Sequence, residues 1–210
     1  MTTPPPRPRG AGPAADRAAR SAPLAPADAP PGYPAQYERL VHLHDGRTVF
    51  IRPIVPGDAA ALAEAISSAD LDTLHRRFLG APPRLSSRLL AHLVTVDYAR
   101  RFAVVAVDTA GRGVGIARYE PAGEGSADVA VAVDPTWRRV GLATELITTL
   151  ARAALENRIH TFTATFLAQN QPVAALLEHA DAAGRAQISQ GIADAVVALD
   201  GAAQVPDTDG

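Results

Sequence analysis

Residues 127–150 read ADVAVAVDPTWRRVGLATELITTL and predict a strand, a turn and a helix in direct succession. Apolar residues alternate with small or polar ones over 127–133, which predicts a β-strand whose even-numbered positions, including Asp128, share one face. Leucines recur every four residues over 142–150, which predicts an amphipathic helix. Residues 134–141 therefore lead directly from a strand into a helix N-terminus.

A turn of this kind is suited to binding an anion. The first amides of a helix lack internal partners, and the helix dipole favours negative charge beside them. Gly141 lets a ligand approach the backbone closely, and Ala143 is nearly as small. Arg138 and Arg139 can donate charge-assisted hydrogen bonds to phosphate oxygens. By spacing alone, an ordinary strand-to-helix turn with two surface arginines fits equally well.

The rest of the chain predicts one domain around this stretch, at 33–201. Its further elements are a strand hairpin at 40–52, helices at 58–66, 71–78 and 86–93, strands at 102–107 and 113–120, a strand at 160–167, a helix after Pro172, and strands at 186–189 and 193–199. Residues 1–32 are rich in Pro, Ala and Arg, and 10 of the 18 prolines fall within the first 34 positions. We expect a disordered leader there and a flexible tail at 202–210.

The composition excludes several classes of function. The chain has 210 residues, a net charge of −2 and no cysteine. Nothing in this balance predicts binding to nucleic acid or a membrane, and disulfides, thiolate nucleophiles and cysteine-ligated zinc are excluded. His42 and His44 share a strand face but have no third ligand, so no metal site is predicted. We expect a cytoplasmic protein.

The turn resembles the signature of the GNAT superfamily of N-acetyltransferases. That signature is Gln or Arg, two residues, Gly, one residue, then Gly or Ala at a helix start, and it is matched by Arg138, Gly141 and Ala143. The resemblance extends over about 48–200. The stretches RRFLGAPPRLSSRLLAHLVTVDY, VGIARYE and ADVAVAVDPTWRRVGLATEL are similar to the acetyltransferase module of bacterial Pat-type protein-lysine acetyltransferases.

This resemblance implies an α/β (α+β) fold and acetyl-CoA as co-substrate. The GNAT fold has a mixed, mostly antiparallel sheet of about seven strands, flanked by four helices and splayed where acetyl-CoA lies. Here the cofactor would lie between the strands at 127–133 and 160–167. The implied contacts are main-chain groups for the pantetheine, turn amides for the pyrophosphate and one asparagine that can also cap the last helix: Val131, Val133, Arg138, Arg139, Val140, Gly141, Leu142, Ala143, Thr144 and Asn170.

The resemblance also implies a catalytic base. A lysine amine of pKa ~10.4 is protonated at pH 7, and its deprotonation costs roughly 4.6 kcal/mol. The Pat-type glutamate corresponds to Asp128, with Glu124 in the preceding loop as a reserve candidate. Asp128 could equally be a solvated acid near a strand end. Many relatives have a tyrosine at the position of Leu177, but a thiol of pKa around 8.5 can leave as a thiolate. Direct attack of the amine on the thioester is therefore expected.

Three functional hypotheses follow. The leading one is an N-acetyltransferase that modifies a protein lysine. The second is an acetyltransferase for a small amine, and the third is a catalytically inert GNAT-like module that binds acyl-CoA. The sequence does not indicate the acceptor or the oligomeric state.

Overall fold

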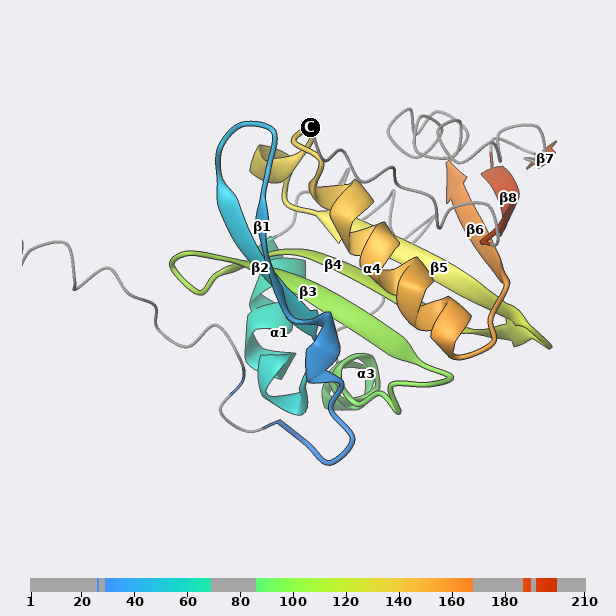
Figure 1. Cartoon of the computed structure of the whole chain (residues 1–210), viewed down its shortest axis with the longest axis horizontal. Helices are drawn as coiled ribbons and strands as arrows, with labels where there is room; N and C mark the ends of the chain where they lie inside the picture. Colours follow the sequence, from blue (N-terminus) through green and yellow to red (C-terminus); the bar gives the residue numbers. More distant parts are fainter. Residues whose placement is uncertain (1–25, 27–28, 69–85, 168–186, 190–191, 200–210) are drawn as a thin grey trace, which may run out of the picture.

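In the computed structural model of the chain, the described residues are 26, 29–68, 86–167, 187–189 and 192–199. They form one sheet of eight strands in the order β1-β2-β3-β4-β5-β6-β8-β7 (Figure 1). The strands are β1 (Arg39–His42), β2 (Thr48–Pro53), β3 (Phe102–Asp108), β4 (Gly113–Gly123), β5 (Ser126–Val133), β6 (Thr161–Leu167), β7 (Gln187–Ser189) and β8 (Ile192–Ala198). The α-helices are α1 (Ala59–Ser68), α3 (Ser87–Val94) and α4 (Leu142–Glu156). Short 3-10 turns occur at η2 (Ala35–Tyr37), η3 (Pro56–Asp58) and η4 (Pro135–Trp137).

Adjacent strands are antiparallel except at one position. The pair β5–β6 is parallel, and its register extends only from Ser126 to Asp128 on β5 and from Thr161 to Thr163 on β6. Beyond these residues β5 continues beside β4, and β6 continues beside β8. The predicted mixed sheet, open at one position, is confirmed, and α4 makes the crossover between the two parallel strands.

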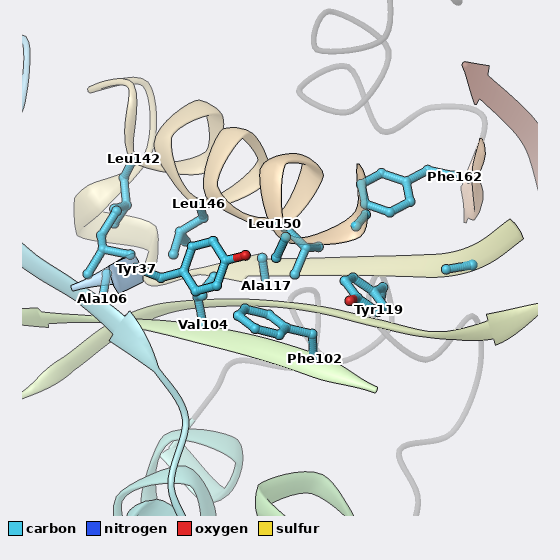
Figure 2. Close-up of a cluster of buried hydrophobic side chains, with 14 of the residues drawn as sticks. Tyr37, Phe102, Val104, Ala106, Ala117, Tyr119, Leu142, Leu146, Leu150 and Phe162 are labelled. Carbon is cyan, nitrogen blue, oxygen red and sulfur yellow. The ribbon is translucent and has the colours of Figure 1, made fainter. Parts of the chain in front are cut away.

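Helix α4 covers one face of the sheet, and α1 and α3 lie on the other (Figure 1). Strand β3 contributes to both layers: Phe102 and Val104 belong to the large core cluster beneath α4, whereas Ala103 packs in a smaller cluster with Ile54 and Val94. Figure 2 shows the leucines of α4 directed onto the sheet in the large cluster. The alternation expected of a strand buried on both faces is thus realised.

Gly115 allows α4 to approach β4 closely. A Cβ atom at this position would lie 2.9 Å from Cδ1 of Leu146 and 3.3 Å from Cδ2 of Leu142. Both leucines are almost fully buried. The glycine therefore helps to set the height of α4 above the sheet, and with it the position of the helix N-terminus.

The predicted hairpin, the helices after 58 and 86, and the strands are confirmed within the described residues. Ser86 caps α3, since its hydroxyl oxygen accepts a hydrogen bond from the Leu89 amide at 3.1 Å. The helix expected at 71–78, Asn170, the helix after Pro172 and Leu177 lie outside the described residues. Most of the leader at 1–32 and the whole tail at 202–210 also lie outside them.

Candidate active site and cofactor turn

The turn after β5 begins with a capped 3-10 segment. The carboxylate of Asp134 accepts hydrogen bonds from the amide of Thr136 at 2.8 Å and from its hydroxyl at 2.6 Å. Partial burial raises the pKa of Asp134, but the two Thr136 bonds outweigh burial and the net pKa is lowered. The carboxylate therefore stays ionised and holds η4 in place.

Two left-handed backbone positions then redirect the chain into α4. Arg139 has φ 60° and Gly141 has φ 89°. Gly141 is the residue before the helix, and the amide of Glu145 donates to its carbonyl oxygen at 3.1 Å. Helix geometry accordingly leaves the amides of residues 142–144 without partners inside α4. Arg138 and Arg139 have exposed side chains, so cationic groups and amides lie close together.

The edge of β5 that faces β6 is open beyond Asp128. Val131 and Val133 are paired in register with Ala117 and Gly115 of β4, and no described strand pairs with them on the other side. Among the described residues, this edge of β5 beyond Asp128 and up to the turn therefore has no strand beside it, and this unpaired edge is called the gap below. An extended ligand in this gap could add hydrogen bonds as a strand would.

Asp128 lies at the point where the two parallel strands part. It is exposed and is the last β5 residue in register with β6, where its partner is Thr163. The Thr163 hydroxyl is 3.5 Å from Oδ1 of Asp128. At about 3.3 Å per residue, Asp128 is roughly 17 Å along the strand from Val133. A carboxylate therefore stands at one end of the gap, and the turn with its two arginines and helix amides lies at the other.

Sequence reasoning missed Glu120, which is the β4 partner of Asp128 in the register. Opposite residues of an antiparallel pair project from the same face, about 4.5–5.5 Å apart at Cβ. Counting back from the turn at Glu124 and Gly125 could have paired the two acids. The bulge between Pro121 and Gly123 makes such a count ambiguous, because it shifts the register by one residue.

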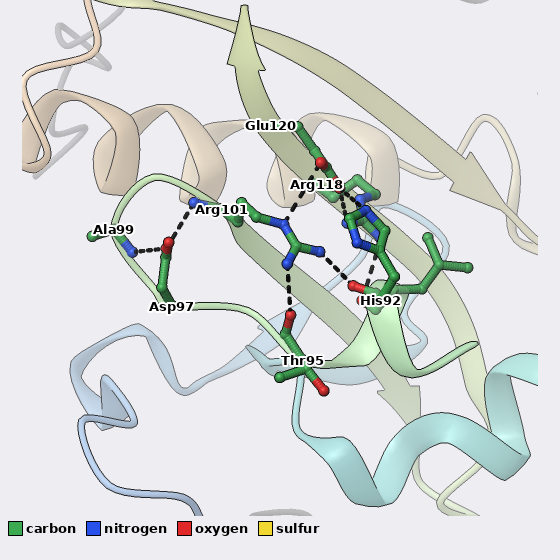
Figure 3. A network of polar contacts seen from close by, with 8 residues as sticks. His92, Thr95, Asp97, Ala99, Arg101, Arg118 and Glu120 are labelled. Atoms are coloured by element: carbon green, nitrogen blue, oxygen red, sulfur yellow. Dashed lines mark hydrogen bonds and ion pairs between the residues drawn. The ribbon is translucent and has the colours of Figure 1, made fainter. Parts of the chain in front are cut away.

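Figure 3 shows the cations around Glu120. Arg118 pairs with Oε1, Nε2 of His92 lies 3.2 Å from the same oxygen, and Nε of Arg101 lies 3.6 Å from Oε2. Arg118 is only 5% exposed and also donates to the Leu93 carbonyl at 3.2 Å. Burial lowers the pKa of Arg118, whereas Glu120 acts in the opposite direction. Through His92 and Arg101, this cluster connects α3 and the segment just before β3 to β4, at the residue paired with Asp128.

Glu124, the reserve candidate, is exposed in the turn between β4 and β5. The last pair of the hairpin is Gly123 with Ser126, so Glu124 lies beyond the paired strands. Asp128 instead lies within β5, beside both neighbouring strands. The geometry thus favours Asp128 over Glu124.

The described residues form neither a metal-binding cluster nor a membrane-spanning helix. In this part of the chain, no group of three or more His, Cys, Asp or Glu side chains is arranged to hold a metal ion. None of the helices in the same part is both long enough and apolar enough to cross a membrane. His42 and His44 are both exposed, and His44 lies in the turn beyond the end of β1.

Comparison with known proteins decides the family. Residues 48–183 match the family described as the acetyltransferase (GNAT) domain. The chain belongs to the GNAT acetyltransferase family. The curated acetyltransferase PA5475 of Pseudomonas aeruginosa is 35% identical over 119 residues, which cover 55% of this chain and 64% of that protein. The chain thus spans less than two thirds of the length of this curated relative.

Solved structures agree with this assignment. The GNAT domain of S. lividans PAT is 26% identical with a TM-score of 0.72, and the match covers 79% of this chain and 99% of that domain. YncA from Salmonella typhimurium, solved with its cofactor acetyl-CoA, is similar in fold, with 19% identity, a TM-score of 0.59 and coverage of 77% and 99%. The expected family, the GNAT fold and acetyl-CoA as the family's co-substrate are confirmed.

Proposed function

We propose that the protein transfers the acetyl group of acetyl-CoA to the amine of a protein lysine, with Asp128 as the general base. The observation that carries this proposal is the position of Asp128. An exposed carboxylate stands where β5 and β6 part, at the far end of an open strand edge from an anion-binding turn. A reactive group at this point would meet the thioester of a cofactor whose phosphates lie at the turn.

The cofactor contacts in this proposal follow the gap. The pyrophosphate would accept hydrogen bonds from amides at Arg139, Val140, Gly141, Leu142, Ala143 and Thr144, with Arg138 adding charge. The pantetheine would pair with the main chain of Val131 and Val133, and Asn170 would contact the cofactor from the far side. The support within the described residues is the left-handed turn, the partner-free helix amides and the open edge of β5.

The reaction balances as a direct transfer. Asp128 takes a proton from the lysine ammonium group, directly or through one water, and passes it to solvent. The neutral nitrogen then attacks the thioester carbonyl carbon, so that a C–N bond forms and the C–S bond breaks. The nitrogen becomes more acidic as it bonds to carbon and releases its second proton by the same route. The thiolate leaves and takes up a proton from solvent. Amides of the β5 edge are the groups available to stabilise the oxyanion.

A protein acceptor is favoured over a small amine by two observations. Asp128 is exposed, so a side chain projecting from another protein can reach it. Nearly the full length of the GNAT domain of S. lividans PAT matches this chain, in accord with the Pat-type resemblance of the sequence.

The test measures CoA release from acetyl-CoA with a panel of lysine-containing proteins and small amines. The chain contains no lysine, so acetyl-lysine detected by mass spectrometry belongs to the acceptor. We expect Asp128→Asn to lower kcat by about 10²- to 10⁴-fold on the preferred acceptor, with unchanged CoA affinity. Glu124→Gln should leave kcat near that of the wild type.

Each alternative has its own result. Turnover on polyamines or amino acids but on no protein would replace the lysine acceptor with a small amine. Tight acetyl-CoA binding without turnover on any acceptor would identify an inert binding module. If Asp128→Asn retained full kcat at every pH, Asp128 would not be the base.

A further inference from the structure

The turn of the β1–β2 hairpin contacts the turn at residues 134–141, here called the cofactor turn, at two points. The amide of His44 donates to the carbonyl of Val140 at 3.1 Å. Nη2 of Arg47 donates to the carbonyl of Thr136 at 2.9 Å, and its guanidinium carbon lies 3.9 Å from the ring centroid of Trp137. Arg138 and Arg139 lie in the sequence between these two points. The hairpin thus contacts the turn on both sides of its arginine pair.

Arg47 is itself held in a defined position. Asp45 accepts from the Arg47 amide at 3.1 Å and from its Nε at 2.6 Å. The carbonyl of Arg47 accepts from the amide of Leu43 at 2.8 Å. These bonds leave the outer edge of the guanidinium directed at Thr136 and its flat face at Trp137. Since few rotamers remain to be lost, the contact with the cofactor turn is preorganised.

The hairpin is also anchored along α4. Arg39 of β1 forms an ion pair with Glu145 at 2.7 Å, and its Nη2 donates to the hydroxyl of Thr149 at 2.9 Å. Glu145 lies in the first turn of the helix, where a carboxylate would otherwise oppose a bound anion. β1 therefore offsets that negative charge and ties the hairpin to the same helix whose N-terminus borders the cofactor turn.

The contacts matter because the turn is strained. A residue other than glycine in the left-handed region, as at Arg139, costs of order 1–2 kcal/mol and persists where the surroundings impose it. At Gly141, a Cβ atom would lie 3.1 Å from the His44 ring, so the hairpin packs directly against the residue that precedes α4. Without these hairpin contacts, the left-handed conformation of the turn would be less stable.

We propose that Arg47 is a positioning residue for the phosphates of acyl-CoA, acting through the turn and assisted by His44. This role of Arg47 rests on the proposed placement of the pyrophosphate at residues 139–144. Arg47 holds η4, so that the amides before α4 and the two arginines converge on one point before the ligand arrives. Arg47 contacts the turn and lies away from Asp128, so its loss should weaken CoA binding and spare the chemical step.

The test compares CoA dissociation constants by calorimetry for Arg47→Ala, Arg47→Lys and Arg152→Ala. Arg152 is a matched control, because it also pairs with an acid, Glu156, and faces a ring, Tyr37, but at the other end of α4. We expect Arg47→Ala to weaken CoA about tenfold, as the loss of a stacked cation and a hydrogen bond predicts. The CoA affinity of Arg47→Lys should lie between those of the wild type and Arg47→Ala, since an ammonium group keeps the charge but lacks the planar guanidinium. Arg152→Ala should bind like the wild type.

Two further readouts separate positioning from general damage. Trp137 is the one tryptophan in the chain, so its emission reports on the turn and should change in Arg47→Ala but not in Arg152→Ala. With an acceptor, the KM for acetyl-CoA should rise while kcat at saturation stays constant. Unchanged CoA affinity despite altered emission, or a fall in kcat alone, would overturn the proposal.

Failure of the underlying placement gives a different result. Arg139→Glu should weaken CoA strongly if the pyrophosphate lies at the turn, because it puts an anion among the phosphate contacts. If Arg139→Glu has no effect, the placement itself is wrong. If it weakens CoA and Arg47→Ala does not, only the role of Arg47 is refuted. Binding needs no acceptor, so both results stand whether or not the acceptor is a protein lysine.

Discussion

Replacing Gly141 with alanine probes the bend between the cofactor turn and α4. An alanine at φ 89° must adopt a conformation that costs L-residues about 1–2 kcal/mol relative to glycine. Its methyl group would also approach the His44 ring to 3.1 Å. His44 is exposed and can rotate away, so this contact should add only a few tenths of a kcal/mol. We expect Gly141→Ala to lower the free energy of unfolding by about 1–2 kcal/mol.

Urea unfolding followed by circular dichroism measures this loss, with an unchanged m-value showing that only stability has altered. Gly111→Ala is the matched control, since Gly111 has φ 80° in the β3–β4 turn and nothing within 4 Å of a new methyl group. Both variants should lose similar stability. Only Gly141→Ala should also lose CoA affinity, because only that residue precedes the helix amides.

A double-mutant cycle with His44→Ala separates the two contributions. If the ring contact is minor, the cycle should give a coupling below about 0.5 kcal/mol. A Gly141→Ala variant as stable as the wild type would refute the reasoning, since the left-handed conformation would then not be required. Equal loss of CoA affinity in Gly111→Ala would refute the link between this bend and the cofactor.

Three other predictions concern the scaffold around the site. Glu120→Gln should destabilise the fold by about 2 kcal/mol in urea, because buried Arg118 loses its carboxylate partner. Glu156→Gln removes the exposed ion pair with Arg152 but keeps an acceptor for the Tyr37 hydroxyl, so it should cost under about 1 kcal/mol; equal losses would contradict this. Gly115→Ala should lower the free energy of unfolding by about 1–3 kcal/mol, because the new methyl group forces Leu146 away from β4. Adding Leu146→Val should restore part of this stability, and no recovery would show that the methyl group clashes elsewhere. Burial raises the pKa of Asp97, but the amides of Arg101, Ala99 and Arg100 outweigh it and lower the net pKa. Asp97 therefore stabilises the fold above pH ~4 and loses that contribution as the pH falls through its lower folded pKa. Urea midpoints measured between about pH 2 and 6 should fall less steeply with decreasing pH in Asp97→Asn than in the wild type, and parallel curves would exclude the effect.

Local pattern was sufficient to predict the elements that form the site. The alternation over 127–133 correctly put Ala127 and Asp128 on opposite faces, and in the structure the first is buried and the second exposed. Gly141 was expected at the helix start because it lets a ligand approach the backbone, and its φ of 89° gives a second reason for that residue type. These features depend on neighbours within a few residues, which is the range over which periodicity carries information.

The missed features depend on pairing between distant segments. Glu120 faces Asp128 only because of the β4–β5 register, which a bulge shifts near the turn. Arg47 reaches Thr136 across 89 residues of sequence, and no local pattern encodes that contact. The left-handed Arg139 was also unexpected, because its conformation is imposed by what packs around the turn and not by its own preference.

The brief pairing of β5 with β6 has a consequence for how the protein opens. Within the sheet, the part formed by β1 to β5 meets the part formed by β6, β8 and β7 at the register of Ser126–Asp128 with Thr161–Thr163. Such a junction is a natural boundary between units that exchange their amide hydrogens separately. A ligand lying in the gap would have to leave before the two parts could separate. At 100 times its dissociation constant it would add about 2.7 kcal/mol to the cost of that opening. Bound acyl-CoA would then slow hydrogen exchange that depends on separation of β5 from β6.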